Sequence, residues 1–214
     1  MRVYQLDDNY AQLRKRAWPK AFKFALVFTG ILWSIFFIDW LISFFNPFFT
    51  LRDFGVHPRR IEYLFGVIAT VFLHGSLSHI VSNTLPLLLA MTALFGNYPK
   101  IAKKVFVYGV LLTGILVWSF ARAANHIGAS GLLYCLLSFL FFSGFIRKDV
   151  QSVGISIIIA FAYGSLIFGV IPDKEHISWE SHLFGFITGI LLSWYFRKTE
   201  RPVFKTYEDW DDED

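Results

Sequence analysis

The stretch Gly128-Ala129-Ser130-Gly131 opens an apolar run that continues to Ile146, GASGLLYCLLSFLFFSGFI. A second apolar run begins at His182. Uncharged runs of this kind predict helices that lie in a lipid bilayer. A hydroxyl and an ionisable imidazole are costly to place at the ends of such helices, so both residues predict a functional site.

Composition agrees with a membrane protein. The chain has 214 residues, of which 55% are hydrophobic and 17% are charged, whereas soluble domains carry roughly 25% charged residues. The 25 Phe and 7 Trp suit contact with lipid and with the membrane interface. Basic residues flank the apolar runs, so we expect contact with the lipid bilayer and no nucleic-acid binding. The single cysteine, Cys135, excludes an intrachain disulfide.

Six apolar segments predict an all-α fold, a bundle of six transmembrane helices. The segments cover about residues 22–45, 80–95, 105–121, 129–146, 153–171 and 181–196. Between the first two lies the apolar segment 61–73, whose 13 residues are too few to cross a bilayer. This segment therefore predicts an interfacial helical loop.

Basic clusters predict the orientation of the bundle. With six spans the clusters at residues 14–23, 100–104, 147–148 and 197–198 all fall on one side, whereas the pair Arg59-Arg60 falls on the other, where contact with lipid head groups would account for it. Both termini are then cytoplasmic, and Ser130 and His182 lie toward the outer side. We divide the chain into a cytoplasmic N-terminal segment (1–20), a six-helix membrane domain (21–198) and an acidic cytoplasmic tail (199–214). Short loops and the lack of a transit-peptide pattern favour a prokaryotic plasma (inner) membrane.

Ser130 stands at a predicted helix N-terminus between two glycines. Gly128 and Gly131 allow close approach of backbone or substrate, and free N–H groups at a helix start can stabilise an oxyanion. The same pattern is also typical of a serine that simply caps its helix.

His182 is followed by Gly185 and Gly189, a spacing that lets two membrane helices pack closely. A histidine above such a face can be a polar packing residue. With a small-residue helix that carries Ser130, it also predicts a Ser–His pair for nucleophilic acyl transfer. Tyr134, one turn after Ser130, could stack on His182, or could be a buried tyrosine that needs a hydrogen-bond partner.

His79 and Asn83 are four residues apart and share one helix face, a few residues after His74. Two polar side chains there could stabilise an oxyanion. One alternative is a metal site formed by His74, His79 and His182, although no carboxylate or thiolate accompanies them. Another is an ion path, for which Asp39 is the only acid well inside a predicted span, although Asp39 also fits a position at the interface.

Together these motifs resemble the rhomboid family of intramembrane serine proteases, and the match covers about residues 21–198. The resemblance rests on Gly128, Ser130, Gly131, Tyr134, His79, Asn83, His182, Gly185 and Gly189. It implies a serine endopeptidase without a cofactor, in which Ser130 is the nucleophile and His182 the general base. His79, Asn83 and the Ser130 N–H would bind the oxyanion, Tyr134 would stack on His182, and His74 matches another family histidine. The implied substrates are transmembrane proteins, cut at small residues.

Two departures from the family pattern stand out. Phe65-Gly66 occupies the place where many members have a Trp-Arg pair, and Ser181 precedes the histidine where alanine is usual. Neither change removes a catalytic atom. Two other functions remain open: a non-catalytic rhomboid-like protein that binds transmembrane helices, and a small transporter or channel.

Overall fold

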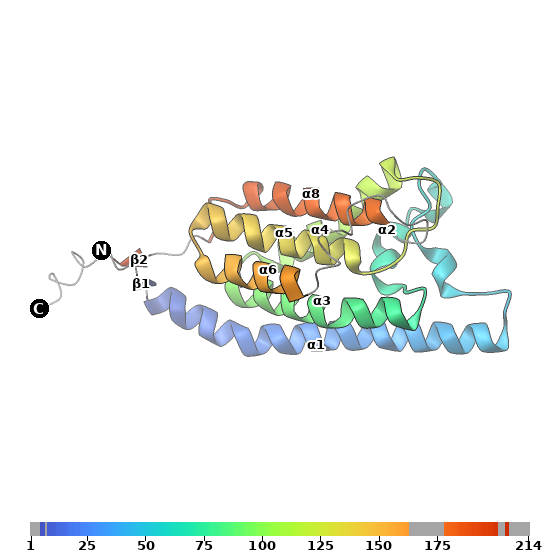
Figure 1. Cartoon of the computed structure of the whole chain (residues 1–214), viewed down its shortest axis with the longest axis horizontal. Helices are drawn as coiled ribbons and strands as arrows, with labels where there is room; N and C mark the ends of the chain where they lie inside the picture. Colours follow the sequence, from blue (N-terminus) through green and yellow to red (C-terminus); the bar gives the residue numbers. More distant parts are fainter. Residues whose placement is uncertain (1–4, 7, 163–177, 201–203, 206–214) are drawn as a thin grey trace, which may run out of the picture.

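Helices dominate the computed structural model, which describes residues 5–6, 8–162, 178–200 and 204–205 (Figure 1). The longer helices are α1 (Asp8–Phe45), α3 (Leu77–Asn97), α4 (Ala102–Phe120), α5 (Ser130–Arg147), α6 (Val150–Ala162) and α8 (Trp179–Tyr195). Four short helical turns connect α1 to α3: η1 (Leu51–Phe54), η2 (Ile61–Tyr63), α2 (Gly66–Ala69) and η3 (Thr70–Phe72). The two-residue strands β1 (Gln5–Leu6) and β2 (Phe204–Lys205) pair antiparallel. Apart from this pair of two-residue strands, all regular elements of the described residues are helical, which confirms the all-α prediction.

The predicted helix ranges agree with α3, α4, α5 and α8 to within a few residues. The predicted start of the first helix near residue 22 is wrong, because α1 begins at Asp8. The predicted interfacial helix over residues 61–73 is broken into the three short pieces η2, α2 and η3. The predicted end of the fifth helix, at residues 163–171, and nearly all of the acidic tail lie outside the described residues.

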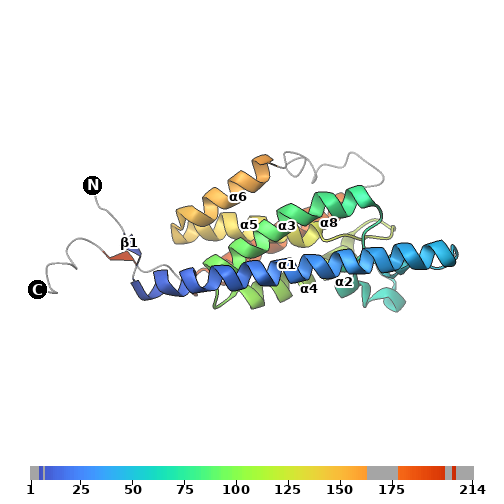
Figure 2. The ribbon, with the colours of Figure 1, turned by 90° about the horizontal axis from the view of Figure 1, so that it is seen from below.

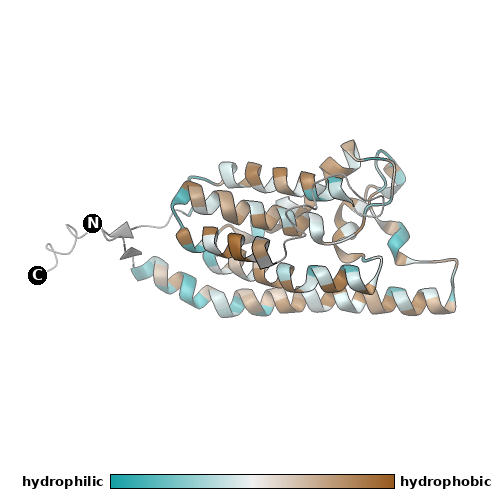
Figure 3. Ribbon diagram, viewed as in Figure 1, coloured by the Kyte–Doolittle hydropathy of each residue, from teal (hydrophilic) through white to brown (hydrophobic). Residues whose placement is uncertain are grey.

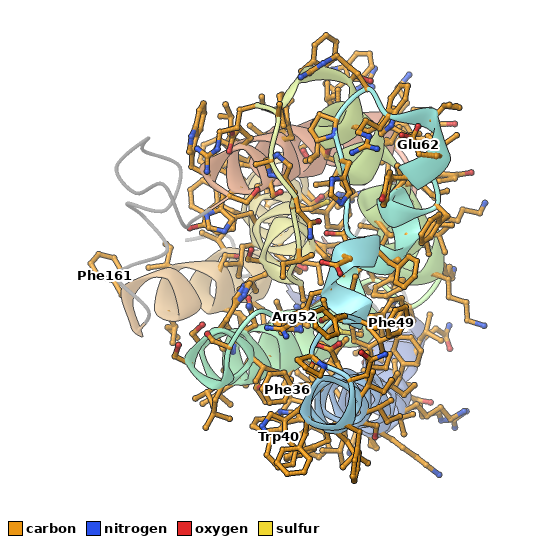
Figure 4. All side chains as sticks on the ribbon, turned by 90° about the vertical axis from the view of Figure 1, so that its right-hand side faces the viewer. Phe36, Trp40, Phe49, Arg52, Glu62 and Phe161 are labelled. Atoms are coloured by element: carbon orange, nitrogen blue, oxygen red, sulfur yellow. The ribbon has the colours of Figure 1, made fainter. Side chains whose placement is uncertain are left out.

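Four of the described helices are long and apolar enough to cross a membrane: α1, α3, α4 and α5. α6 and α8 have 13 and 17 residues, fewer than the roughly 20 of a perpendicular span. Figure 3 shows apolar colour along the helices and polar colour mainly at the two ends of the bundle. Large apolar side chains point away from the bundle, for example Trp40 and Phe161 in Figure 4. An apolar exterior of this extent requires lipid around it.

α5 is the central helix of the bundle. In its most apolar window 72% of the residues are buried, against 28% in α1 and in α4. It packs most extensively against α8 and also contacts α3, α4 and α6, whereas α1 packs along α3 (Figures 1 and 2). A helix surrounded in this way holds its side chains in fixed positions, which suits a site at its first residue.

Glycine allows α8 to approach α5 closely. A Cβ atom at Gly185 would collide with the backbone carbonyl of Gly131, and one at Gly189 with Ser138 Oγ and the Cys135 carbonyl. Ser138 donates a hydrogen bond to the carbonyl of Phe186 across the same contact, at 2.9 Å. The glycine spacing found in the sequence therefore brings the two helix backbones into contact.

A buried polar network joins the start of α1 to distant segments. The Arg14 guanidinium donates to the side chain of Asn97 and, at 3.0 Å, to the carboxylate of Asp149. Asn97 donates to Ser152 Oγ at 3.1 Å, and the Ser152 hydroxyl donates to Asp149 at 3.0 Å. These contacts explain why α1 starts so early: Tyr10 and Arg14 in its polar first turns are buried, and the Arg14 side chain binds the end of α3 and the turn between α5 and α6.

At the opposite end, the long connection between α1 and α3 folds back onto the bundle (Figure 4). Asp39 pairs with Arg52 at 2.9 Å and accepts the N–H of Leu51 at 2.5 Å. Val56 then exchanges two backbone hydrogen bonds of 2.9 Å with His126, between α4 and α5. The connection is thereby tied to the end of the bundle at which α5 and α8 begin.

We expect Gly189→Ala to lower the free energy of unfolding by about 1–3 kcal/mol, because an added methyl group overpacks the contact between α5 and α8. Gly30→Ala is the matched control: nothing lies within 4 Å of a Cβ there. It should raise the free energy of unfolding by up to about 1 kcal/mol through helix propensity alone. Thermal unfolding in detergent micelles measures both changes, and equal melting temperatures for the two variants would contradict the close contact.

Candidate active site

The turn before α5 holds Ser130 in place. Gly128 has a φ of 118°, which side chains rarely adopt, and its N–H donates to the Thr70 carbonyl at 2.9 Å. A Cβ atom at Gly128 would lie 2.6 Å from His79 Nε2. Glycine is therefore required at this position both for the backbone conformation and for the close approach of His79.

Ser130 and His182 meet at the starts of their helices. The Ser130 hydroxyl lies 2.8 Å from His182 Nε2, a hydrogen-bonding distance, and both residues are only 9% exposed. The ring of Tyr134 stacks on that of His182, with centroids 4.3 Å apart and planes 13° from parallel. The stack covers one face of the imidazole and restricts its rotation. These three predicted site residues are thus in direct contact.

His79 and Asn83 lie in the first two turns of α3. The His79 ring is beside Gly128, as the close approach described above requires. Asn83 is buried, and its side-chain amide donates to the His79 carbonyl at 2.9 Å. His79 therefore reaches the serine turn directly, while Asn83 lies one turn further along the helix.

His74 supports the residue that precedes the serine. Its Nε2 accepts the backbone N–H of Ala129 at 3.4 Å, and its ring lies 5.0 Å from that of His79. Burial, together with the nearby His79, lowers the pKa of His74 to about 3. His74 is consequently neutral at pH 7, the state in which a ring nitrogen can accept a hydrogen bond.

The alternatives from the sequence gain no support from this geometry. Among the described residues, no group of three or more His, Cys, Asp and Glu side chains could hold a metal ion. Asp39, the one acid considered for an ion path, is engaged by Arg52, Leu51 and Thr50 and anchors the loop after α1.

A cavity of about 20 Å³, room for roughly one water molecule, lies beside the serine turn. It opens between α4, α5, α8 and the connection from α1 to α3. Its wall includes Val56, Val71, Val110, Val117, Gly128 and Gly131. These residues leave a small, mainly apolar space beside Gly128 and Gly131, the glycines that flank Ala129 and Ser130.

Sequence reasoning missed a group of polar residues around the start of α8. His126 Nδ1 lies 2.6 Å from Ser178 Oγ, which lies 2.6 Å from Ser181 Oγ. Arg122 pairs with the buried carboxylate of Glu180 at 3.5 Å. The available signal was a histidine two residues before Gly128.

A serine hydroxyl within hydrogen-bond distance of a histidine ring is the arrangement that activates a nucleophile by general-base catalysis. Here the pair itself is buried, at the starts of α5 and α8. The chemistry open to such a site is acyl transfer to Ser130, with His182 as the proton acceptor.

Comparison with known proteins gives the family. The family model of the Rhomboid domain matches residues 62–199, more than half of the chain. Uncharacterized proteins of Mycobacterium bovis and Mycobacterium tuberculosis are each 31% identical over 159 residues, which are 70% of this chain and 66% of those proteins. One of Mycobacterium leprae is 29% identical over 200 residues, 89% of this chain and 77% of that protein. The family match includes both Ser130 and His182, and the chain belongs to the rhomboid family.

Proposed function

We propose that this protein is an intramembrane serine endopeptidase, which hydrolyses peptide bonds in or near the transmembrane segments of other membrane proteins. The distance of 2.8 Å between Ser130 Oγ and His182 Nε2 carries the proposal. Membership of the rhomboid family supports it, because members of that family are generally intramembrane serine proteases.

In the proposed reaction, His182 Nε2 takes the hydroxyl proton as Ser130 Oγ attacks the carbonyl carbon of the scissile bond. The tetrahedral intermediate collapses, the C–N bond breaks, and His182 returns the proton to the leaving amine. A water molecule then attacks the acyl ester while His182 accepts one of its protons. The ester bond breaks, the carboxyl product leaves, and Ser130 regains its proton.

Three groups are proposed to stabilise the oxyanion. Ser130 is the first residue of α5, so its N–H belongs to the free end of the helix. The His79 ring beside Gly128 and the side chain of Asn83 supply the other donors. The Asn83 amide has two N–H bonds, and its bond to the His79 carbonyl uses one of them.

A small residue next to the scissile bond fits the proposed substrates. The cavity of about 20 Å³ beside Gly128 and Gly131 supports a substrate side chain no larger than a methyl or hydroxymethyl group. A transmembrane helix must also unwind locally before its carbonyl can meet Ser130, and small residues such as glycine weaken a helix at that point.

We also propose that all six predicted helices span a bacterial plasma membrane, with both termini cytoplasmic and the site open to the outer side. The membrane domain is proposed to extend over residues 21–198, between the segments 1–20 and 199–214. Support comes from the four long apolar helices and from the mycobacterial relatives. The basic clusters, all at the end of the bundle away from Ser130, support the orientation.

Ser130→Ala and His182→Ala should each abolish cleavage of a transmembrane reporter, a loss of about 10⁴-fold or more, because each removes a reacting group. The measurement is reporter cleavage by purified protein in liposomes, with thermal unfolding as the control for folding. Cys135→Ala, a buried thiol change in the same helix, is the matched control and should keep activity.

The alternatives give different outcomes in the same preparation. A fluorophosphonate probe should label the wild-type serine and not Ser130→Ala; an unlabelled wild type that still binds transmembrane helices would identify a non-catalytic binding protein. Solute flux into liposomes that survives Ser130→Ala would identify a transporter or channel. Full cleavage by Ser130→Ala would overturn the proposal.

Asn83→Ala should lower kcat by about 10²-fold and leave KM nearly unchanged, because an oxyanion donor acts mainly in the transition state. Steady-state cleavage kinetics give both constants. Ser82→Ala is the neighbouring control, since the exposed Ser82 hydroxyl only donates to the His79 carbonyl. An Asn83→Ala variant as active as Ser82→Ala would remove Asn83 from the proposed oxyanion site.

The topology is tested with single cysteines in a Cys135→Ala background. Ala123 and Lys148 are exposed, in the α4–α5 and α5–α6 turns respectively. A membrane-impermeant maleimide added to intact cells should label Ala123→Cys and not Lys148→Cys, since the charge distribution places these turns on opposite sides. The reverse labelling would invert the proposed orientation.

A further inference from the structure

We propose that His126 is a positioning residue for the Ser130–His182 pair, and that it acts through Ser178 and Ser181 at the start of α8. The proposal rests on the proposed protease function, because a positioning role requires a reaction. The contacts that carry it can be measured without catalysis.

The backbone of His126 is fixed from several sides. It exchanges two hydrogen bonds of 2.9 Å with Val56, and Thr70 Oγ1 donates to the His126 carbonyl at 2.8 Å. The residue is 1% exposed and lies two residues before Gly128, whose N–H is also held by Thr70. The imidazole therefore extends toward α8 from a part of the chain that is already locked.

Hydrogen-bond chemistry gives this contact a direction. His126 Nε2 lies 3.0 Å from the Arg122 carbonyl oxygen, which can only accept, so Nε2 carries the proton. In the neutral ring Nδ1 is then an acceptor, and the Ser178 hydroxyl donates to it at 2.6 Å. Ser178 Oγ in turn accepts from the Ser181 hydroxyl at 2.6 Å. Three residues thus form one directed chain.

Burial keeps His126 in the neutral form that this chain needs. It lowers the pKa of His126, and the charged or titratable groups around the ring are Glu180, Arg122 and His57. The ion pair of Arg122 and Glu180 also links the α4–α5 connection to the start of α8. Its contact is longer, at 3.5 Å, and the Arg122 side chain is partly exposed. The His126 chain is the shorter and more buried of the two links.

The chain ends where α8 touches the nucleophile's helix. The Ser181 carbonyl lies 3.1 Å, and Ser181 Cβ 3.4 Å, from the position of a Cβ atom at Gly131. Gly131 follows Ser130, and Ser181 precedes His182. A shift of the first turn of α8 therefore moves His182 relative to Ser130, and a misplacement of about 1 Å can cost about 10²-fold in rate. Ser181, which replaces the usual alanine, thereby gains a role.

His126→Phe keeps a ring of similar size and removes both hydrogen bonds. We expect kcat for reporter cleavage to fall by about 10- to 100-fold, with KM within about twofold of wild type. His126→Gln keeps one donor and one acceptor and should recover at least half of that loss on a logarithmic scale. His57→Phe is the matched control: His57 lies in the connection between α1 and α3, where it contacts Asp53 and Tyr63. The hydrogen bonds from His126 to Ser178 and Ser181 do not include it, so this variant should leave kcat unchanged.

Hydrogen exchange of residues 178–184 provides the readout that needs no activity. Those amides should exchange faster in His126→Phe and in Ser178→Ala than in wild type, and at the wild-type rate in His57→Phe. Ser178→Ala deletes only a single hydroxyl group. This variant therefore tests the proposal even if His126→Phe fails to fold. Unchanged exchange, unchanged kcat, or a His126→Gln variant as slow as His126→Phe would each overturn the role of His126. A wild type that cleaves no reporter would instead overturn the protease proposal.

Discussion

Close contact between the backbones of α5 and α8 is the constraint on which the site depends. Serine and histidine side chains are both short. His182 Nε2 can therefore lie 2.8 Å from Ser130 Oγ only if the starts of α5 and α8 nearly touch. Gly185 and Gly189 make this possible, because a single methyl group at either would meet backbone or hydroxyl oxygen of α5. Within lipid there is no hydrophobic effect to press helices together, so fitted small residues and hydrogen bonds supply the attraction.

A polar site in such a bundle is stable only if its polar groups have partners. Several side chains around Ser130 have such partners: His74 Nε2 accepts from Ala129, Asn83 donates to its own helix, and Ser130 meets His182. The bonds of Asn83 and Ser130 also orient groups that the proposed reaction would use. The interactions that make burial tolerable are therefore the same ones that organise the site.

Most of the helices and the Ser130–His182 contact could be predicted from the sequence, because apolar runs and the glycine and histidine spacings are local patterns. The start of α1 could not. Its first turns look like a polar leader, and only the contacts of Arg14 with Asn97 and Asp149, far along the chain, show why they are helical. His126 was missed for the same reason: its partners Ser178 and Ser181 belong to another segment, and no spacing rule connects them.

The proposed oxyanion donors depend on a different part of the fold from the Ser–His pair. His79 and Asn83 belong to α3, which packs along α1 rather than along α8. α1 is anchored at one end by Arg14, which pairs with the buried Asp149. At the other end it is anchored by the buried Asp39, which pairs with the partly exposed Arg52. Removing one member of the buried Arg14–Asp149 pair leaves an unpaired buried charge and is strongly unfavourable, so this contact in particular resists sliding of α1. The proposed nucleophile and base are thus held by glycine packing between α5 and α8, whereas the proposed oxyanion donors depend on the packing of α3 against the anchored helix α1.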